Sequence, residues 1–152
     1  MIVRKVAVLG AGVMGAQIAA HLVNVNVPVI LFDLPAKEGD PDAIVKKGIA
    51  GLAKLEPAPL GTKDRAAHIG VANYATGLAR LAECDLVIEA IAERLDWKRD
   101  LYAKIVPHLA PHAILATNTS GLSLAALSEV LPAAIRPRFC GQLTDHTSVV
   151  AE

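Results

Sequence analysis

The amino-acid sequence predicts an α/β fold, in which a doubly wound, mostly parallel sheet has helices on both faces. Short apolar runs alternate with helical patterns along the chain, which is typical of parallel strands joined by crossover helices. The apolar runs are continuous rather than alternating, as expected for strands that are buried on both faces. A glycine-rich turn joins the first run to the first helical pattern. Together these observations indicate a single α/β domain.

Four apolar runs predict the main strands, at residues 6–9, 29–32, 86–90 and 113–116. Two weaker runs predict an edge strand and a further strand, at 69–72 and 138–141. No internal repeat, low-complexity segment or interdomain linker interrupts the series. Because 152 residues are enough to bury a core of ordinary size, we expect one domain.

Helical patterns fill the spaces between these runs. After the glycine-rich turn, apolar side chains recur at helical spacing at Ile18, Ala19, Leu22 and Val23. A second helix is expected to have Asp40 as its N-cap and Pro41 as its first residue, and to stop before Pro57. A third, roughly 96–109, is expected to bury one face made of Trp97, Leu101, Ile105 and Leu109. A short fourth helix is expected at 124–131.

The composition excludes several classes of function. The 15 basic and 15 acidic residues balance, so no basic surface for nucleic acid or for an anionic membrane is indicated. Aromatic residues make up 3% of the chain, too few for the stacking platforms of proteins that bind single strands. We find no apolar stretch that would span a membrane, no signal peptide and no metal-ligand spacing. Because Cys84 and Cys140 are expected to be reduced thiols, we predict a cytoplasmic protein.

The glycine-rich turn has the spacing of a dinucleotide-binding fingerprint. It leaves a predicted strand and opens a predicted helix, as in Rossmann-type domains, and reads Gly10-Ala11-Gly12-Val13-Met14-Gly15. We expect Gly10 to allow the tight turn, Gly12 to let the backbone approach a pyrophosphate, and Gly15 to allow close helix packing. The first helical turn, with Val13 and Met14, would offer unpaired N–H groups and a partial positive charge to the phosphates.

An acidic residue follows at the end of the second predicted strand. Asp33 stands at about the spacing at which a carboxylate meets the adenosine ribose of a bound dinucleotide. A carboxylate there accepts hydrogen bonds from a free 2′-hydroxyl and repels a 2′-phosphate. The predicted cofactor is therefore NAD rather than NADP.

Four segments in order resemble the N-terminal domain of the 3-hydroxyacyl-CoA dehydrogenases. They are "GAGVMGAQIAAHL", "DLVIEAIAERLDWKRDLY", "ILATNTSGLS" and "RPRFCG", and the resemblance runs from residue 4 to residue 141. It looks closest to the bacterial multifunctional type, in which this domain belongs to a longer fatty-acid oxidation protein. The resemblance implies NAD-dependent interconversion of 3-hydroxyacyl-CoA and 3-ketoacyl-CoA, the predicted substrate and product.

The resemblance also implies roles for particular residues. Glu93 and Lys98 match positions that contact NAD, and Asn118 lines the nicotinamide pocket. Ser120 matches the serine that hydrogen-bonds the substrate oxygen. Each has a structural alternative: Ser120 as a helix cap, Lys98 as an exposed helix lysine, and Glu93 as a charge favourable to the helix dipole. Lys46 and Lys47 would either meet CoA phosphates or form a solvated helix face.

The family's catalytic histidine belongs to a Gly-x-His-Phe-Phe-Asn-Pro motif that follows the "RFCG" stretch. Here the motif would begin at Gly141 and place the histidine at position 143, which is Leu143. His146 comes three residues late and lacks the rest of the motif, so we expect no general base in this segment. We therefore expect residues 1–141 to form the NAD-binding domain and 142–152 a tail outside the family. The helical C-terminal domain of the family is expected to be absent, through truncation or frameshift.

Two other functions remain open on the sequence alone. The chain could be a free-standing NAD-binding sensor or partner-binding module, or a β-hydroxyacid dehydrogenase of the 6-phosphogluconate-related group. In either case the front half would still hold NAD. We further expect a homo-oligomer, because an apolar face around Ile114, Leu124 and Phe139 would lack its family partner domain.

Overall fold

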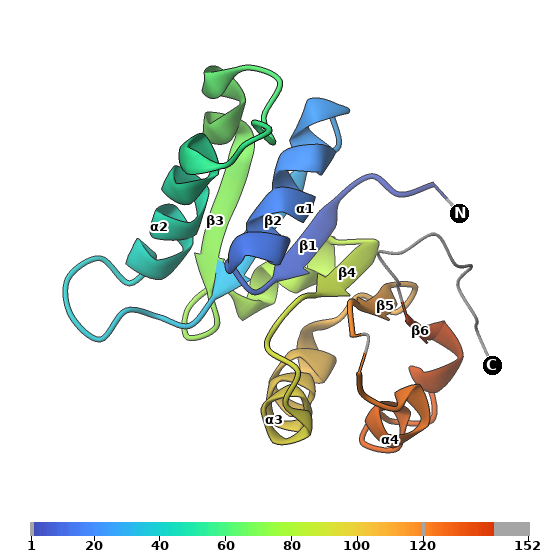
Figure 1. Ribbon diagram of the computed structural model, residues 1–152. Helices are drawn as coiled ribbons and strands as arrows, with labels where there is room; N and C mark the ends of the chain where they lie inside the picture. The colour runs from blue at the N-terminus through green and yellow to red at the C-terminus, as the bar shows by residue number, and fades with distance from the viewer. Residues whose placement is uncertain (1, 120, 142–152) are drawn as a thin grey trace.

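The computed structural model describes residues 2–119 and 121–141 and contains a parallel sheet of six strands (Figure 1). The strand order is β3-β2-β1-β4-β5-β6, and every neighbouring pair is parallel. The strands are β1 (Val6–Leu9), β2 (Val29–Asp33), β3 (Ile69–Asn73), β4 (Leu86–Glu89), β5 (Ile114–Thr117) and β6 (Phe139–Gly141). The order reverses between β1 and β4, which confirms the predicted doubly wound, Rossmann-type fold and the edge strand at 69–72.

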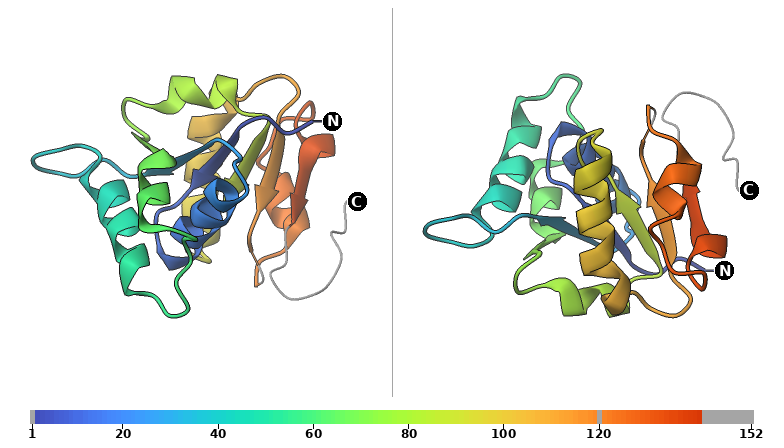
Figure 2. Two further views of the ribbon diagram at one scale, coloured as in Figure 1. Left: turned by 90° about the horizontal axis from the view of Figure 1, so that it is seen from above. Right: turned by 90° about the horizontal axis from the view of Figure 1, so that it is seen from below.

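Helices cover both faces of the sheet, as the views from above and below show (Figure 2). One face carries α1 (Val13–Asn24) and α2 (Ala43–Gly51), and the other carries α3 (Leu95–Ile105) and α4 (Leu124–Ser128). Short 3₁₀ turns complete the connections: η1 (Leu52–Lys54), η2 (Lys63–His68), η3 (Leu78–Glu83), η4 (Val106–His108) and η5 (Arg136–Arg138). No helix in the described part of the chain is long and apolar enough to cross a membrane.

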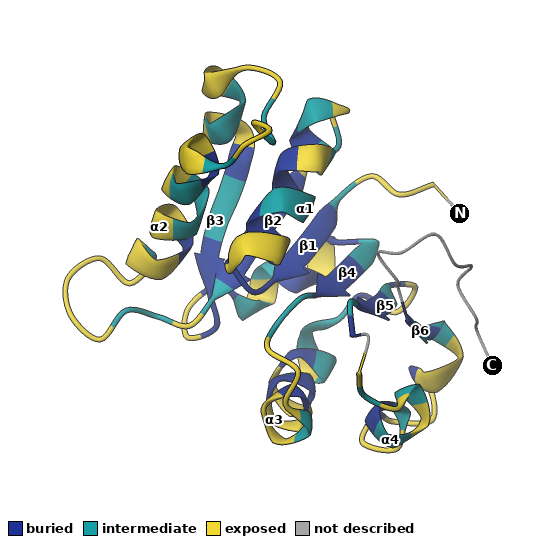
Figure 3. Cartoon of the chain, viewed as in Figure 1, coloured by how far each residue is buried: buried dark blue, intermediate teal, exposed yellow. Residues whose placement is uncertain are grey.

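The sheet divides the core into two layers. Val6 and Val8 of β1 pack with the small side chains of α1, whereas Ala7 and Leu9 pack with α3 and α4. All four residues of β1 are fully buried, and Figure 3 shows the central strands as the most buried part of the molecule. The continuous apolar runs in the sequence therefore reflect strands covered on both faces.

Small residues let α1 and α2 pack closely against the glycine-rich turn. The buried side of α1 is made of Gly15, Ala16, Ala19, Ala20 and Val23. On α2, a Cβ atom added to Gly48 would lie 2.3 Å from the carbonyl oxygen of Ala11. The position of α2 thus depends on the absence of a side chain at Gly48, and this contact links α2 to the turn.

The second helix begins later than predicted. Its N-cap is Asp42 rather than Asp40, and Pro41 lies before the helix rather than within it. Asp40 instead accepts a hydrogen bond from the N–H of Asp42 (2.9 Å), and its backbone carbonyl accepts from Ala43 (3.0 Å). Its carboxylate also pairs with Lys46. The local turn made by Asp40 competes with helix formation and delays the start of α2.

Two apolar side chains, Trp97 and Phe139, differ from the prediction in how far they are buried. Leu101 and Ile105 are buried on α3 as expected, but Trp97 is 49% exposed, and the Arg94 guanidinium lies 4.3 Å from the centre of its ring. Phe139 is buried in an edge-to-face contact with Tyr102, with ring centroids 6.0 Å apart. Phe139 therefore does not contribute to an exposed apolar face, whereas Ile114 and Leu124 are partly exposed.

Alanine substitution at two glycines of α2 tests the close approach to the glycine-rich turn. We expect Gly48→Ala to destabilise the chain by about 1–3 kcal/mol, because its Cβ would overlap a backbone carbonyl that has little room to move. Gly51→Ala is the control, since its Cβ meets no atom within 4 Å. That variant should be as stable as the wild type or up to about 1 kcal/mol more stable. Urea unfolding measures both, and equal stability of the two variants would contradict the packing described.

Candidate cofactor-binding site

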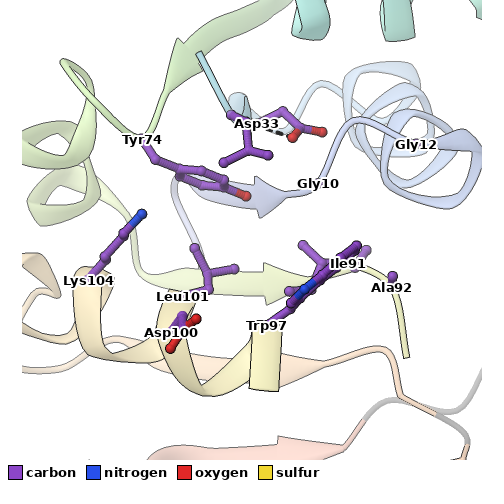
Figure 4. A pocket seen from close by; sticks show the side chains of 12 residues that line it. Gly10, Gly12, Asp33, Tyr74, Ile91, Ala92, Trp97, Asp100, Leu101 and Lys104 are labelled. Atoms are coloured by element: carbon purple, nitrogen blue, oxygen red, sulfur yellow. Dashed lines mark hydrogen bonds between the residues drawn. The ribbon is translucent and has the colours of Figure 1, made fainter. Parts of the chain in front are cut away.

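A crevice of about 460 Å³ opens at the carboxyl ends of β1, β2 and β4, where the strand order reverses (Figure 4). Open α/β sheets bind ligands at this point, because loops from neighbouring strands diverge there. The crevice is lined from three directions. Gly10 and Gly12 come from the glycine-rich turn, Asp33 from β2, and Ile91 and Leu101 from the loop after β4 and from α3.

The three glycines of the turn differ in what surrounds them. Gly10 has a φ of +106°, and a Cβ there would lie 2.7 Å from the carbonyl oxygen of Ala90. A Cβ on Gly15 would lie 1.7 Å from the carbonyl oxygen of Gly10, so the predicted roles of Gly10 in the tight turn and of Gly15 in close helix packing are confirmed. A Cβ on Gly12 would meet no atom within 4 Å. The fold itself does not need a glycine at Gly12, and the space beside its backbone is free to receive a ligand.

The first turn of α1 faces this space. Gly12 is the N-cap of α1 and no side chain caps the helix, while the first intrahelical bond runs from Ala16 to Gly12. The N–H groups before Ala16 have no partner within the helix, and the helix dipole adds a partial positive charge to them. Val13 and Met14 are both exposed here. This arrangement suits a phosphate group.

Asp33 connects the second strand to the glycine-rich turn. Its Oδ2 accepts a hydrogen bond from the N–H of Ala11 (2.7 Å), and its Oδ1 accepts one from the N–H of Leu34 (2.6 Å). Each carboxylate oxygen can accept a further hydrogen bond. The side chain thus holds the turn in place and still presents acceptors to the crevice that it lines.

Several of the large exposed apolar side chains surround this edge. Val13, Met14, Leu34 and Trp97 are between 42% and 65% exposed. Leu34 and Trp97 line the crevice directly, and Val13 stands at the neighbouring groove with Gly12 and Asp33. Apolar side chains that gather around a concave site with a few polar groups are typical of cofactor-binding pockets.

Behind the crevice, the carboxylate of Glu89 is fully buried and fully hydrogen-bonded. Its Oε2 accepts from the ammonium of Lys98 (2.6 Å) and from the N–H of Ile91 (2.9 Å). Its Oε1 accepts from the hydroxyls of Tyr102 (2.7 Å) and Thr117 (2.9 Å). Burial and the nearby Glu89 carboxylate raise the pKa of Tyr102, so the phenol stays a donor. We call Glu89, Lys98, Tyr102 and Thr117 the Glu89 cluster.

Glu89 was not among the residues predicted to form the site. One signal was available, because Glu89 is an acidic residue inside the apolar run "LVIEAIA". Lys98 and Tyr102 follow four residues apart on one helix, a spacing that places both side chains on the same face. An isolated charge in a buried strand requires such partners.

Glu93 links the loop after β4 to the loop after β5 by hydrogen bonds. Its Oε2 accepts hydrogen bonds from the Thr119 hydroxyl and from the N–H of Gly121 (3.2 Å). Asn118 lies between these contacts and the cluster, and its N–H donates to the carbonyl of Glu89 (2.8 Å). The side-chain oxygen of Asn118 is buried and has no hydrogen-bond partner. An acceptor left unpaired at this edge fits a site that a bound group completes.

The structure brings together most of the residues predicted to bind NAD. Gly10, Gly12 and Asp33 line one crevice, Val13 lines the neighbouring groove, and Met14 follows it in the first turn of α1. Glu93 and Asn118 lie further along the same edge of the sheet, while Gly15 is buried beneath the turn. Their contacts with NAD stay predictions. Ser120, Leu143 and His146 lie outside the described residues.

Lys98 is buried, so the alternative of an exposed helix lysine is wrong. It has no exposed area, and its ammonium pairs with Glu89 and lies 4.0 Å from Glu93 Oε1. The structure therefore assigns Lys98 to the Glu89 cluster behind the crevice, and the contact with NAD stays a prediction. Lys46 pairs with Asp40, whereas Lys47 lines the groove between α1 and α2. Within residues 2–119 and 121–141, no cluster of His, Cys, Asp or Glu side chains could hold a metal ion.

Residues 5–141 match the protein family described as "3-hydroxyacyl-CoA dehydrogenase, NAD binding domain". The chain is 45% identical over 138 residues to a Rickettsia felis protein named as a fatty acid oxidation complex trifunctional enzyme, covering 90% of this chain and 19% of that protein. It is 41% identical over 143 residues to a Deinococcus radiodurans protein named as a 3-hydroxyacyl-CoA dehydrogenase, covering 93% and 41%. The chain thus spans less than half the length of either relative.

Two solved structures of 3-hydroxybutyryl-CoA dehydrogenases are also similar to this chain. The 3-hydroxybutyryl-CoA dehydrogenase of Escherichia coli is 30% identical with a TM-score of 0.72, covering 93% of this chain and 29% of that one. The (S)-3-hydroxybutyryl-CoA dehydrogenase of Ralstonia eutropha is 32% identical with a TM-score of 0.73, covering 92% and 48%. The fold and the sequence therefore point to the same family.

Substitution within the Glu89 cluster tests its contribution to stability. We expect Glu89→Gln to lower the free energy of unfolding by about 3–5 kcal/mol, because the Lys98 ammonium would stay buried without a counter-charge. Asp96→Asn, on the helix that carries Lys98, is the control, since it breaks the exposed pair with Arg94 and should cost less than about 1 kcal/mol. Adding Lys98→Met to Glu89→Gln should recover part of the loss. Urea unfolding measures all of these variants, and similar losses in Glu89→Gln and Asp96→Asn would rule out the cluster's predicted importance.

Proposed function

The chain belongs to the 3-hydroxyacyl-CoA dehydrogenase NAD-binding domain family, and on this premise we propose that it holds NAD for the interconversion of 3-hydroxyacyl-CoA and 3-ketoacyl-CoA. The observation that carries the proposal is the joint position of Gly12 and Asp33 at the reversal point of the sheet. Gly12 leaves space beside a helix N-terminus, and Asp33 offers acceptors next to it. This pairing fits a pyrophosphate beside a ribose with a free 2′-hydroxyl.

Particular residues would hold the cofactor, which supplies hydride transfer when it is bound. The N–H groups at Gly12, Val13 and Met14 would bind the pyrophosphate, and Asp33 would bind the adenosine ribose. Because Asp33 is already held by Ala11 and Leu34, its carboxylate is oriented before any ligand arrives. An oriented carboxylate disfavours a 2′-phosphate by charge repulsion, so NAD is preferred over NADP.

The loop after β5 would serve the nicotinamide and the substrate. Asn118 provides a buried acceptor without a partner, and Glu93 holds the neighbouring Thr119 and Gly121. Ser120, between these two residues in the sequence, is assigned from the family resemblance as the contact to the substrate oxygen.

We propose that this chain turns over little substrate by itself. The family resemblance expects a histidine at position 143, where the sequence has Leu143. A histidine is suited to accept the hydroxyl proton because its pKa lies near neutrality, and leucine has no titratable group. His146 has none of the motif residues around it, so we assign it no catalytic role.

Location and assembly follow as parts of the same proposal. The two cysteines, Cys84 and Cys140, are both free, which suits the reducing cytoplasm predicted for the chain. A homo-oligomer is supported by the partly exposed apolar side chains of Ile114 and Leu124. The family match favours a dehydrogenase domain over a separate sensor module or an enzyme of the 6-phosphogluconate-related group.

Nucleotide binding tests the cofactor assignment. We expect the chain to bind NADH, followed by nucleotide fluorescence, roughly tenfold or more tightly than NADPH, a difference of about 1.4 kcal/mol. Gly12→Ala should keep the stability of the wild type within about 1 kcal/mol, yet weaken NADH binding roughly tenfold, because the new methyl group occupies the free space. Gly51 lines the neighbouring groove but not the crevice, and a Cβ there meets no atom within 4 Å, so Gly51→Ala should bind NADH like the wild type. An unchanged NADH affinity in Gly12→Ala would argue against a pyrophosphate at this turn.

Turnover tests the missing base. With acetoacetyl-CoA and NADH, we expect the 152-residue chain to show no measurable NADH oxidation above the uncatalysed rate, while it still binds NADH. A 3-hydroxybutyryl-CoA dehydrogenase with its motif intact provides the positive control. Turnover by this chain at a rate near that of the control would refute the proposed loss of the base.

A further inference from the structure

The hydroxyl of Tyr74 is buried and has no hydrogen-bond partner. In the part of the chain that the structure describes, only two buried side-chain polar atoms lack a partner, Tyr74 Oη and Asn118 Oδ1. Both follow a strand at the carboxyl edge of the sheet, on opposite sides of the β1–β4 reversal. Buried polar atoms are nearly always paired, so an unpaired one requires an explanation. Asn118 already belongs to the proposed nicotinamide side, whereas Tyr74 has no assigned role.

The backbone and the ring of Tyr74 are firmly held. Its N–H donates to the carbonyl of Asp33 (3.1 Å), and its ring is stacked on Phe32 with centroids 6.3 Å apart and an interplanar angle of 10°. Just before it, Asn73 accepts hydrogen bonds from the N–H groups of Ala75 (2.9 Å) and Thr76 (3.0 Å). The ring is 8% exposed. Tyr74 is thus fixed next to Asp33, and its unpaired hydroxyl belongs to an ordered side chain.

The hydroxyl faces the cofactor crevice. Tyr74 lines the same cavity as Asp33 and Leu101, and Figure 4 shows its ring lying between them with the oxygen directed toward the side of Gly10. The Asp33 carboxylate, which accepts from Ala11 and Leu34, makes no hydrogen bond to the Tyr74 hydroxyl. A group that enters the crevice would supply the acceptor that the protein lacks.

The phenol is a neutral donor. Burial, together with the nearby carboxylates of Asp33 and Glu89, raises the pKa of Tyr74 above its usual value. It therefore keeps its proton throughout the neutral range and is available as a hydrogen-bond donor. Leu34, Ile91 and Leu101 add apolar surface to the same crevice, which suits a flat heteroaromatic ring.

We propose that Tyr74 is a binding residue for the adenosine half of the cofactor, to which its hydroxyl donates a hydrogen bond. The inference rests on the proposed function, since it assumes that Asp33 binds the adenosine ribose. Tyr74 is adjacent to Asp33, while the nicotinamide side lies across the reversal at Asn118. The acceptor is a ring nitrogen or a ribose oxygen of the nucleoside.

Removing the Tyr74 hydroxyl should affect the stability of the free chain and the binding of the cofactor differently. In the free chain the hydroxyl is desolvated without a compensating bond, so removing it should not destabilise the fold. In the complex the hydroxyl is paired, so removing it should weaken binding. A hydroxyl with a purely structural role would instead stabilise the free chain. Tyr102 provides the comparison, because its hydroxyl is also buried but donates to Glu89.

The experiment compares Tyr74→Phe and Tyr102→Phe with the wild type. Without nucleotide, we expect the urea midpoint of Tyr74→Phe to equal or exceed that of the wild type, and that of Tyr102→Phe to fall. Calorimetry with NADH, ADP-ribose and reduced nicotinamide mononucleotide then locates the contact. Tyr74→Phe should weaken NADH and ADP-ribose by the same factor, roughly three- to tenfold, and leave the mononucleotide unchanged.

Each other outcome overturns the inference in a distinct way. Unchanged affinity for ADP-ribose means that the hydroxyl makes no contact with the adenosine half, and a loss confined to the mononucleotide assigns Tyr74 to the nicotinamide side. A fall in the urea midpoint like that of Tyr102→Phe means that the role is structural. If the wild-type chain binds neither NADH nor ADP-ribose, the proposed function fails first and this inference fails with it.

Discussion

The buried carboxylate of Glu89 holds together the part of the sheet on which the crevice is built. A charge without access to water must be neutralised and hydrogen-bonded, and Glu89 has both a counter-charge and four donors. These donors come from α3, from β5 and from the loop after β4. One side chain at the end of a strand therefore determines how three elements meet. The requirement is strict, because an unmatched charge at this depth would be strongly destabilising.

The crevice depends on this arrangement. The Glu89 carboxylate holds the N–H of Ile91, and Ile91 lines the crevice. Ala90, one residue earlier, lies so close to Gly10 that only glycine fits there, so the loop after β4 also supports the glycine-rich turn. Asp33 holds that turn from the other side. The floor and walls are therefore ordered without a ligand, which reduces the ordering cost of binding.

Local patterns were sufficient for some elements and misleading for others. The apolar runs correspond to the six strands because strands covered on both faces must be continuously apolar. The predicted start of the second helix was wrong, because the Asp40 carboxylate accepts a hydrogen bond from the N–H of Asp42 and forms a turn. Trp97 was predicted to be buried from its spacing, but it lies at the rim of the crevice beside Arg94. Helical spacing gives the face of a side chain but not the extent to which neighbouring elements cover it.

The sequence by itself determined the fold class, the glycine-rich turn and the acidic residue after the second strand. Each of these depends on residues close together in the chain and on rules that hold in any parallel sheet. Only the tertiary structure decided that Glu89 pairs with Lys98, Tyr102 and Thr117, and that Tyr74 lies in the crevice beside Asp33. Thr117 is 28 residues from Glu89, and Tyr74 reaches Asp33 through the pairing of β2 with β3. Burial and hydrogen-bond partners of this kind arise only when distant segments pack together, and no local pattern specifies them.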